Sequence, residues 1–227
     1  MDLKAAEDRV VLRSLEQVFG VQLLQIGAWG KPGCLLEHAR TQRKGMVGDE
    51  GAGASIVGDP TALGISSDSI DAVLLPHTLE LSTEPHRVLR EAERVLIGEG
   101  CLLVLGFNPL SAWGLRRAFS RSRFPPGIEQ FISERRIRDW LKLLGFEVEH
   151  VHHYLFAPPF RRRSPAREPR QIDRARPAWQ RYLAGGYLVV AKKHVYTLTP
   201  IRPRWSRRKV MGGLAEPSAR SIHSSSG

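Results

Sequence analysis

The feature that most constrains the fold is a strand–helix–strand pattern between residues 70 and 107. Two apolar runs, Ile70–Leu75 and Cys101–Phe107, show no polar alternation, which is typical of parallel strands buried on both faces. The segment between them has apolar residues at helical spacing, at Val88, Leu89, Ala92, Val95 and Leu96. This order predicts a βαβ unit and therefore a parallel sheet.

Cap residues indicate where that helix begins and ends. Thr83 or Ser82 can serve as the N-cap, and Pro85 suits the first turn because its missing N–H has no partner there in any case. Gly98 stands where a glycine often ends a helix. We therefore expect a helix from about residue 84 to Gly98.

Further elements are expected on both sides of this unit. Before it, the sequence predicts a helix from Asp2 to about Phe19, a strand over 21–26, a short helix over 33–39, and strands over 44–48 and 55–57 separated by a flexible turn. After it come an amphipathic helix over 110–119, a helix capped by Ser133 and running to Leu144, and strands from Phe146 and over 186–192. The fold class expected is α/β: a Rossmann-like doubly wound, mostly parallel sheet with an antiparallel C-terminal edge and helices on both faces.

Length and composition favour one soluble domain with extensions. The chain has 227 residues, 42% of them hydrophobic, and no run approaches the ~18 consecutive apolar residues of a membrane helix. Its N-terminus shows no secretory leader. Cys34 and Cys101 are far apart and fit no metal spacing. His152 and His153 are adjacent, so on a strand they point to opposite faces. We expect free thiols, no metal and a cytoplasmic location.

Charge is distributed unevenly along the chain. The net charge is +11, with an acidic first half and a strongly basic second half. This asymmetry favours an anionic partner such as RNA or an acidic surface, although a solvated basic tail without a specific partner is equally compatible. Residues 1–195 are expected to form the domain, with an Arg/Pro-rich insertion at about 158–181, and residues 196–227 a basic, disordered tail.

Several blocks in order resemble one known family. They are the acidic turn Asp59–Leu63, the strand ending at Pro76, the His77-Thr78-Leu79-Glu80 motif, the helix with Leu89-Arg90-Glu91, and the strand after Gly100. This order is similar to class I S-adenosylmethionine (SAM) dependent methyltransferases of the type 11 branch, which includes ubiquinone and menaquinone methyltransferase-like proteins. The resemblance covers roughly residues 21–109 and implies SAM as the cofactor.

The resemblance also implies which residues bind the cofactor. The turn after the first strand holds Gln25, Gly27 and Trp29, where the family has an acid and a Gly-x-Gly. An acid at the end of the second strand, here Asp49, would take the ribose hydroxyls. Other positions implied at the site are Asp59, which would accept from the adenine amino group, and Leu63, Pro76 and His77.

Catalytic residues are harder to predict, because methyl transfer from a sulfonium mainly requires alignment of donor and acceptor. His77 is a candidate base, with His152 and His153 as alternatives. Residues 107–127 stand where relatives build a substrate lid, and Asn108, Trp113 and Arg117 are the lid candidates. Trp113 can equally be a packing residue.

The leading hypothesis is a SAM-dependent methyltransferase with an unidentified acceptor, either a small molecule or an anionic or RNA substrate. The alternative is an inactive methyltransferase-like binding or regulatory module that uses its basic second half. A dehydrogenase of the NAD type is disfavoured, since the G-x-G-x-x-G fingerprint is absent.

Overall fold

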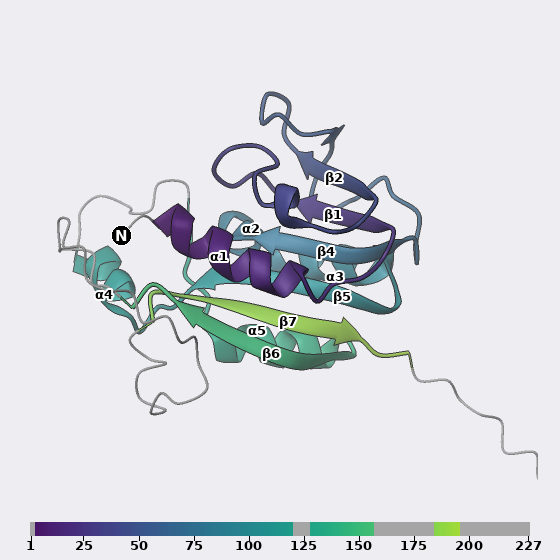
Figure 1. Ribbon diagram of the computed structural model, residues 1–227. Helices are drawn as coiled ribbons and strands as arrows, with labels where there is room; N and C mark the ends of the chain where they lie inside the picture. Colours follow the sequence, from purple (N-terminus) through teal and green to yellow (C-terminus); the bar gives the residue numbers. More distant parts are fainter. Residues whose placement is uncertain (1–2, 120–127, 157–183, 196–227) are drawn as a thin grey trace, which may run out of the picture. The chain divides into compact units, whose positions relative to one another are not determined.

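The computed structural model describes residues 3–119, 128–156 and 184–195, which build one sheet with helices on both faces (Figure 1). The predicted insertion at 158–181 and the predicted tail at 196–227 lie outside these residues. Within the described ranges no helix is long and apolar enough to cross a membrane.

The sheet has seven strands in the order β3-β2-β1-β4-β5-β7-β6. The strands are β1 (Gln22–Ile26), β2 (Arg43–Gly48), β3 (Ile56–Val57), β4 (Ile70–Pro76), β5 (Leu96–Phe107), β6 (Phe146–Tyr154) and β7 (Gly186–Lys193). The helices are α1 (Leu3–Leu15), the 3-10 turn η1 (Leu36–His38), α2 (Thr78–Leu81), α3 (Pro85–Val95), α4 (Ala112–Phe119) and α5 (Glu134–Leu143).

Strand direction confirms the predicted fold class. The strands β1 to β5 are parallel to one another, while β7 runs antiparallel to both β5 and β6. Chain order reverses between β1 and β4, which are adjacent in the sheet. In doubly wound sheets ligands bind beyond the carboxyl ends of the strands at such a reversal, so this edge is where a site is expected.

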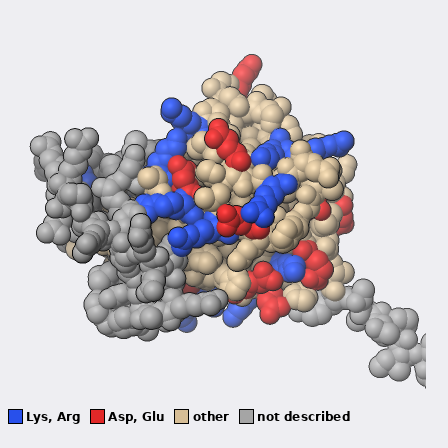
Figure 2. Space-filling model, viewed as in Figure 1, with Lys and Arg blue, Asp and Glu red and all other residues tan. Residues whose placement is uncertain are grey.

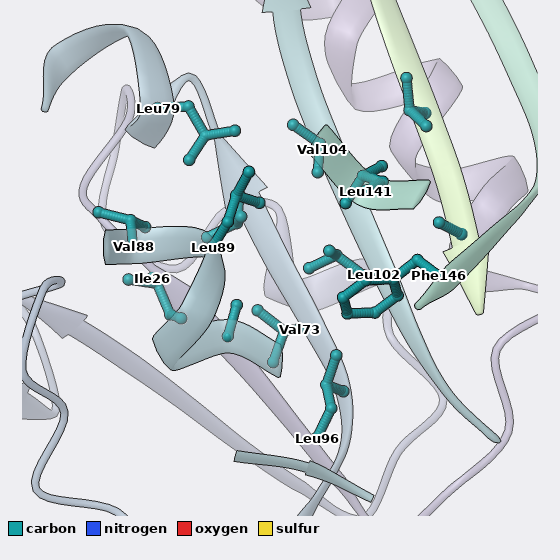
Figure 3. Packing of buried hydrophobic residues seen from close by; sticks show 14 of the residues in the cluster. Ile26, Val73, Leu79, Val88, Leu89, Leu96, Leu102, Val104, Leu141 and Phe146 are labelled. Carbon is teal, nitrogen blue, oxygen red and sulfur yellow. The ribbon is translucent and has the colours of Figure 1, made fainter. Parts of the chain in front are cut away.

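Alternate residues of the central strands supply two separate cores. Val73 and Leu75 of β4 belong to the core beneath α3 and α5, and Figure 3 shows Val73 there beside Leu89 and Leu102. Their neighbours Ala72 and Leu74 face the opposite side, where α1 and η1 cover the sheet. Because both faces are buried, the strand sequences show no polar alternation.

The predicted crossover helix is confirmed, but both of its predicted caps are wrong. Its N-cap is Glu84, without a side-chain cap bond, and Pro85 follows in the first turn. Ser82 Oγ instead accepts from Glu84 N at 3.1 Å. The helix ends at Val95, and Gly98 lies inside β5 rather than at a helix end.

A bulge at the start of β5 explains the misplaced Gly98. Ile70 pairs with Leu96, but Ala72, two residues on, pairs with Cys101. The extra residues of β5 are accommodated by Glu99 at φ 63°. Glycine is common at bulges as well as at helix ends, and sequence alone does not separate the two.

The N-terminal elements are shorter than predicted, whereas α5 matches. Helix α1 ends at Leu15 instead of near Phe19, and its expected cap, Asp2, is outside the described residues. Only η1 forms within the helix predicted over 33–39. For α5 the predicted cap is confirmed, since Ser133 Oγ accepts from Arg136 N at 3.4 Å.

Charge on the described residues is close to balanced. Acidic and basic side chains are about equally frequent there, and Figure 2 shows them interspersed over one face. The Arg-rich stretches behind the predicted anionic partner fall mostly in 157–183 and 196–227, outside the described residues. That partner therefore stays a prediction.

Candidate functional site

The turn after β1 forms the middle of the candidate site. Gly27 has φ +91°, and its N–H donates to Val47 O of β2 at 2.8 Å. A Cβ at this position would lie 2.6 Å from Thr78 Oγ1, and the Thr78 hydroxyl donates to Ile26 O. Only glycine allows this approach between the β1 turn and the start of α2.

The side chain of Gln25 is hydrogen-bonded to the same turn. It is fully buried, and its Nε2 donates to Gly27 O at 3.0 Å and to Met46 Sδ at 3.4 Å. Among the described residues nothing donates to its buried Oε1. An unsatisfied buried acceptor is unusual in proteins, so this oxygen can take a hydrogen bond from a ligand or water at the turn.

Two exposed carboxylates follow the neighbouring strands β2 and β3. Asp49 comes directly after β2, and Asp59 stands two residues beyond β3. The oxygens of Asp59 accept from Thr61 N at 2.7 Å and from Thr61 Oγ1 at 2.8 Å. These bonds, with a smaller contribution from Arg87, hold the pKa of Asp59 below its usual value. Asp59 is therefore an ionised acceptor with lone pairs open to solvent.

Leu63 and Pro76 support the site without offering polar side chains. Leu63 is buried, its N–H donates to Glu91 Oε2 at 2.8 Å, and its carbonyl accepts from Arg94 Nη2 at 2.9 Å. The acidic turn is thus fixed to α3. Pro76 is buried at the end of β4, opposite Leu105 of β5.

His77 is buried between two carboxylates. It adopts the left-handed conformation at φ 57° as the N-cap of α2, and its side chain is fully buried. Its Nδ1 lies 2.7 Å from Glu80 Oε2, and its Nε2 lies 3.0 Å from Glu7 Oε1 of α1. Burial alone would lower its pKa, yet the bonds to Glu7 and Glu80 raise the pKa to about 9. His77 is therefore an imidazolium at neutral pH.

Glu80 ties this group to the rest of the fold. Besides His77, its carboxylate accepts from Phe107 N at 2.9 Å and from Ile132 N at 3.4 Å. Its backbone oxygen accepts from Glu129 N at 3.0 Å. Burial raises the pKa of Glu80, and the bond to His77 acts against that rise. We refer to Glu7, His77 and Glu80 as the buried triad.

Aromatic rings line the triad on the side of the β1 turn. The Trp29 indole N–H donates to Glu7 Oε2 at 2.8 Å, and its ring centroid lies 4.4 Å from that of His77. Phe107 stacks on His77 at 4.2 Å, and Phe131 stacks on Phe107 at 5.2 Å. Trp29 thus brings the β1 turn, helix α1 and the end of β4 together.

The three lid candidates occupy different environments. Asn108 shapes the turn before α4, where its Oδ1 accepts from Leu110 N at 3.0 Å. Trp113 is partly buried and packs on the core beneath α1. Arg117 lies over the ring of Phe131, with Cζ 4.9 Å from the centroid. The guanidinium of Arg117 therefore contacts the row of aromatic rings that leads to His77.

The sequence interpretation missed Glu7 and Glu80 as site residues. Glu80 is part of the quoted His-x-Leu-Glu motif, but its role was not assigned. Glu7 gave a local signal, since it shares the buried face of α1 with Val10 and Val11. A charged residue on an apolar helix face is rarely buried unless it is paired, and this could have identified it.

Comparisons with known proteins agree with this architecture. The family model described as "Methyltransferase domain" matches residues 35–104. A curated relative, the uncharacterized protein YafS of Escherichia coli strain K12, is 37% identical over 148 residues, which cover 63% of this chain and 59% of the relative. The chain therefore spans less than two thirds of that relative's length.

Solved structures share the fold at low sequence identity. A SAM-dependent methyltransferase of Thermotoga maritima, described as a possible histamine N-methyltransferase, aligns with a TM-score of 0.63 at 20% identity, covering 82% of this chain and 89% of that chain. A SAM-dependent methyltransferase of Archaeoglobus fulgidus aligns with a TM-score of 0.59 at 15% identity, covering 82% and 93%.

Proposed function

Because a methyltransferase-domain family model matches residues 35–104, we propose that the chain belongs to the class I SAM-dependent methyltransferase family and transfers a methyl group from SAM to an acceptor yet to be identified. One observation carries the proposal. The exposed carboxylates of Asp49 and Asp59 follow β2 and β3, the two strands on one side of β1, and Gly27 lies in the turn after β1. That is a set of hydrogen-bond acceptors beside a backbone turn, which suits a nucleoside.

The residues present fit the cofactor that the family uses. Asp49 would accept from both ribose hydroxyls, because one carboxylate can take two adjacent O–H donors. Asp59 is ionised and can accept from the adenine amino group. A Cβ on Gly30 would meet nothing within 4 Å, so the turn is open there. The buried, unpartnered Oε1 of Gln25 offers one further acceptor at the turn.

The buried triad and Trp29 would form the wall at the methyl-donor end. Bound SAM would supply an electrophilic sulfonium methyl group for transfer to the acceptor, with S-adenosylhomocysteine as the leaving group. The chain then has to align the acceptor and exclude water.

In this proposal His77 is a positioning residue rather than the base of the earlier hypothesis. Both ring nitrogens already donate to carboxylates, and its pKa of about 9 keeps the proton on the ring at neutral pH. A base should instead be largely unprotonated near the working pH. The alternative function, a binding module without catalysis, gains no support from the comparisons.

Thermal unfolding with excess SAM, or with its product S-adenosylhomocysteine, tests the proposal. A ligand at ~100 times Kd that binds only the folded state adds about 2.7 kcal/mol, which shifts the midpoint of a chain this size by roughly 5–10 °C. We expect that shift in the wild type and its loss in Asp49→Ala and Asp59→Ala.

The matched control is Asp139→Ala, which removes an exposed carboxylate from α5. This variant should keep the full ligand-induced shift of the unfolding midpoint. Its result shows whether losing any negative charge, rather than losing Asp49 or Asp59, abolishes ligand binding. An unshifted wild type at millimolar ligand would refute the cofactor site. A full shift in the double variant Asp49→Ala/Asp59→Ala would show that the carboxylates do not hold the ligand.

A further inference from the structure

Arg117 presents a guanidinium group that the fold holds in place. Its Nη2 donates to two carbonyl oxygens, Ile128 O and Glu129 O, both at 2.7 Å. The group lies over the Phe131 ring at 4.9 Å, a distance at which a cation is attracted to the ring face. Three contacts thus fix the plane of the guanidinium.

One nitrogen of this group is left over. Arg117 Nη1 is buried, and within the described residues no group accepts a hydrogen bond from it. A buried charged donor without an acceptor costs more than a neutral one, and such groups call for an explanation such as a bound ion, ligand or water. The Nη1 hydrogens are therefore available to an acceptor from outside the chain.

The place of Arg117 connects it with the proposed methyl-donor end. Phe131, beneath the guanidinium, stacks on Phe107, which in turn stacks on His77. The loop whose carbonyl oxygens accept from Arg117 Nη2 is also hydrogen-bonded to Glu80, whose backbone oxygen accepts from Glu129 N. Arg117 and Glu80 of the buried triad are therefore hydrogen-bonded to the same loop.

Within the described residues no carboxylate forms an ion pair with this cation. The Glu80 carboxylate is used by His77, Phe107 N and Ile132 N. Glu129 belongs to the loop, but its exposed side chain forms no ion pair with Arg117. The guanidinium next to an apolar ring suits an oxyanion such as a carboxylate or a phosphate, which arginine binds with better geometry than lysine does.

Resting on the proposed function, we propose that Arg117 Nη1 binds an oxyanion of the methyl acceptor, a carboxylate or a phosphate. The acceptor class is then anionic. Its reacting atom would lie toward Trp29 and its anionic group toward α4. The proposal selects Arg117 from the basic residues of the second half by its unfilled hydrogen-bonding capacity rather than by charge alone.

Titration with small probes tests this site. Benzoate, phenyl phosphate and the neutral benzamide are each titrated calorimetrically into the full chain, with and without saturating S-adenosylhomocysteine. We expect both anions to bind and benzamide to bind at least tenfold more weakly. Comparing the two anions distinguishes a carboxylate from a phosphate acceptor. Arg117→Gln should weaken anion binding by about 10- to 100-fold, the effect of losing a charged hydrogen bond.

Two further variants separate geometry from charge. Arg116→Gln removes the same charge from the same helix and should bind both anions within about twofold of the wild type. Arg117→Lys keeps the charge but loses the planar fork, so its affinity should fall between those of the wild type and Arg117→Gln. Equal anion affinity in Arg117→Gln and the wild type, or anions no tighter than benzamide, would overturn the proposal.

Failure of the anion site and failure of the proposed function give different results. If only the anion site is wrong, S-adenosylhomocysteine still shifts the unfolding midpoint of the wild type and of Arg117→Gln. If the cofactor proposal is wrong, that shift is absent while the titration without S-adenosylhomocysteine still reports on Arg117. Thermal unfolding of Arg117→Gln also verifies that the variant folds.

Discussion

The two ends of the candidate site are built in opposite ways. At the β2–β3 end, Asp49 and Asp59 are exposed and are held by contacts a few residues away. At the β4 end, Glu7, His77 and Glu80 are buried and held by contacts up to 70 residues apart. The first end can lose a side chain at little cost to folding, whereas the second is part of the core. Binding and stability should therefore respond to different residues.

The largest expected effect is that of His77→Ala. Removing the imidazolium leaves Glu7 and Glu80 buried without their shared partner, and breaking a buried ion pair in this way costs about 3–5 kcal/mol. Urea unfolding at pH 7 measures the loss. His150→Ala, at an exposed position on β6, should stay within about 0.5 kcal/mol. A loss below about 1 kcal/mol for His77→Ala would mean that the triad contributes little to the core.

The same residue predicts a pH dependence. The pKa of His77 is about 9 in the fold against 6.5 for the free side chain, so its contribution to stability is complete below about pH 6.5. That contribution is lost as the pH rises through 9. The 2.5-unit difference corresponds to about 3 kcal/mol. We expect the free energy of unfolding of the wild type to fall between pH 6.5 and 9.5.

The control for this pH dependence is His77→Gln, in which the group that titrates is gone. Its free energy of unfolding should be nearly flat up to about pH 9. Above that pH, Cys101 begins to contribute, because burial raises its pKa to about 12. An equal fall in the wild type and in His77→Gln would assign the dependence to other groups.

A smaller effect is expected at the junction of the two ends. Gly27 and Gly30 both have positive φ, at +91° and +69°. A Cβ on Gly27 would press against Thr78, whereas one on Gly30 would meet nothing within 4 Å. Both alanine variants carry backbone strain of about 1 kcal/mol, and Gly27→Ala adds a clash of about 1–3 kcal/mol. Chemical denaturation of the two variants measures the energy of the clash as the difference between their losses of stability. Equal losses in Gly27→Ala and Gly30→Ala would show that there is no clash.

The smallest effect on stability belongs to the exposed acids. Asp49→Asn should change the free energy of unfolding by about 0.5 kcal/mol or less, although the same residue is expected to be needed for the cofactor. Asp59→Ala should cost somewhat more, because it also frees the Thr61 N–H and hydroxyl. Thermal unfolding without ligand measures both. If either loss matched that of His77→Ala, the contrast between the two ends would fail.

The parts that could be predicted from the sequence are those set by local pattern. The apolar runs of β4 and β5 and the apolar stripe of α3 are visible in the spacing of their own residues. Ser133 could be predicted as the N-cap of α5 because its hydroxyl is a typical cap acceptor. Gly98 was misplaced because a bulge in β5 and a helix end favour the same residue. The bulge depends on the register between β4 and β5. A short stretch of sequence holds no information on that register.

The candidate site divides along the same line. Asp49 and Asp59 follow predicted strands, and the family resemblance gave them a cofactor-binding role at the strand ends. The partners of His77 could not be found in this way, because Glu7 lies on a helix that reaches the site across the sheet. The pKa of His77, and with it the choice between base and positioning residue, depends on distant Glu7 as well as on nearby Glu80.

The strand order has a consequence for how the chain folds during its synthesis. Strand β7 lies between β5 and β6 but is made last of the three. At about 5–20 residues per second, roughly 4–16 s pass between completion of Phe107 and arrival of Gly186. Throughout that interval β5 has an unpaired edge that carries the most apolar stretch of the protein. A ribosome-bound chaperone, or slow codons placed after β7 rather than before it, should therefore raise the yield of folded protein.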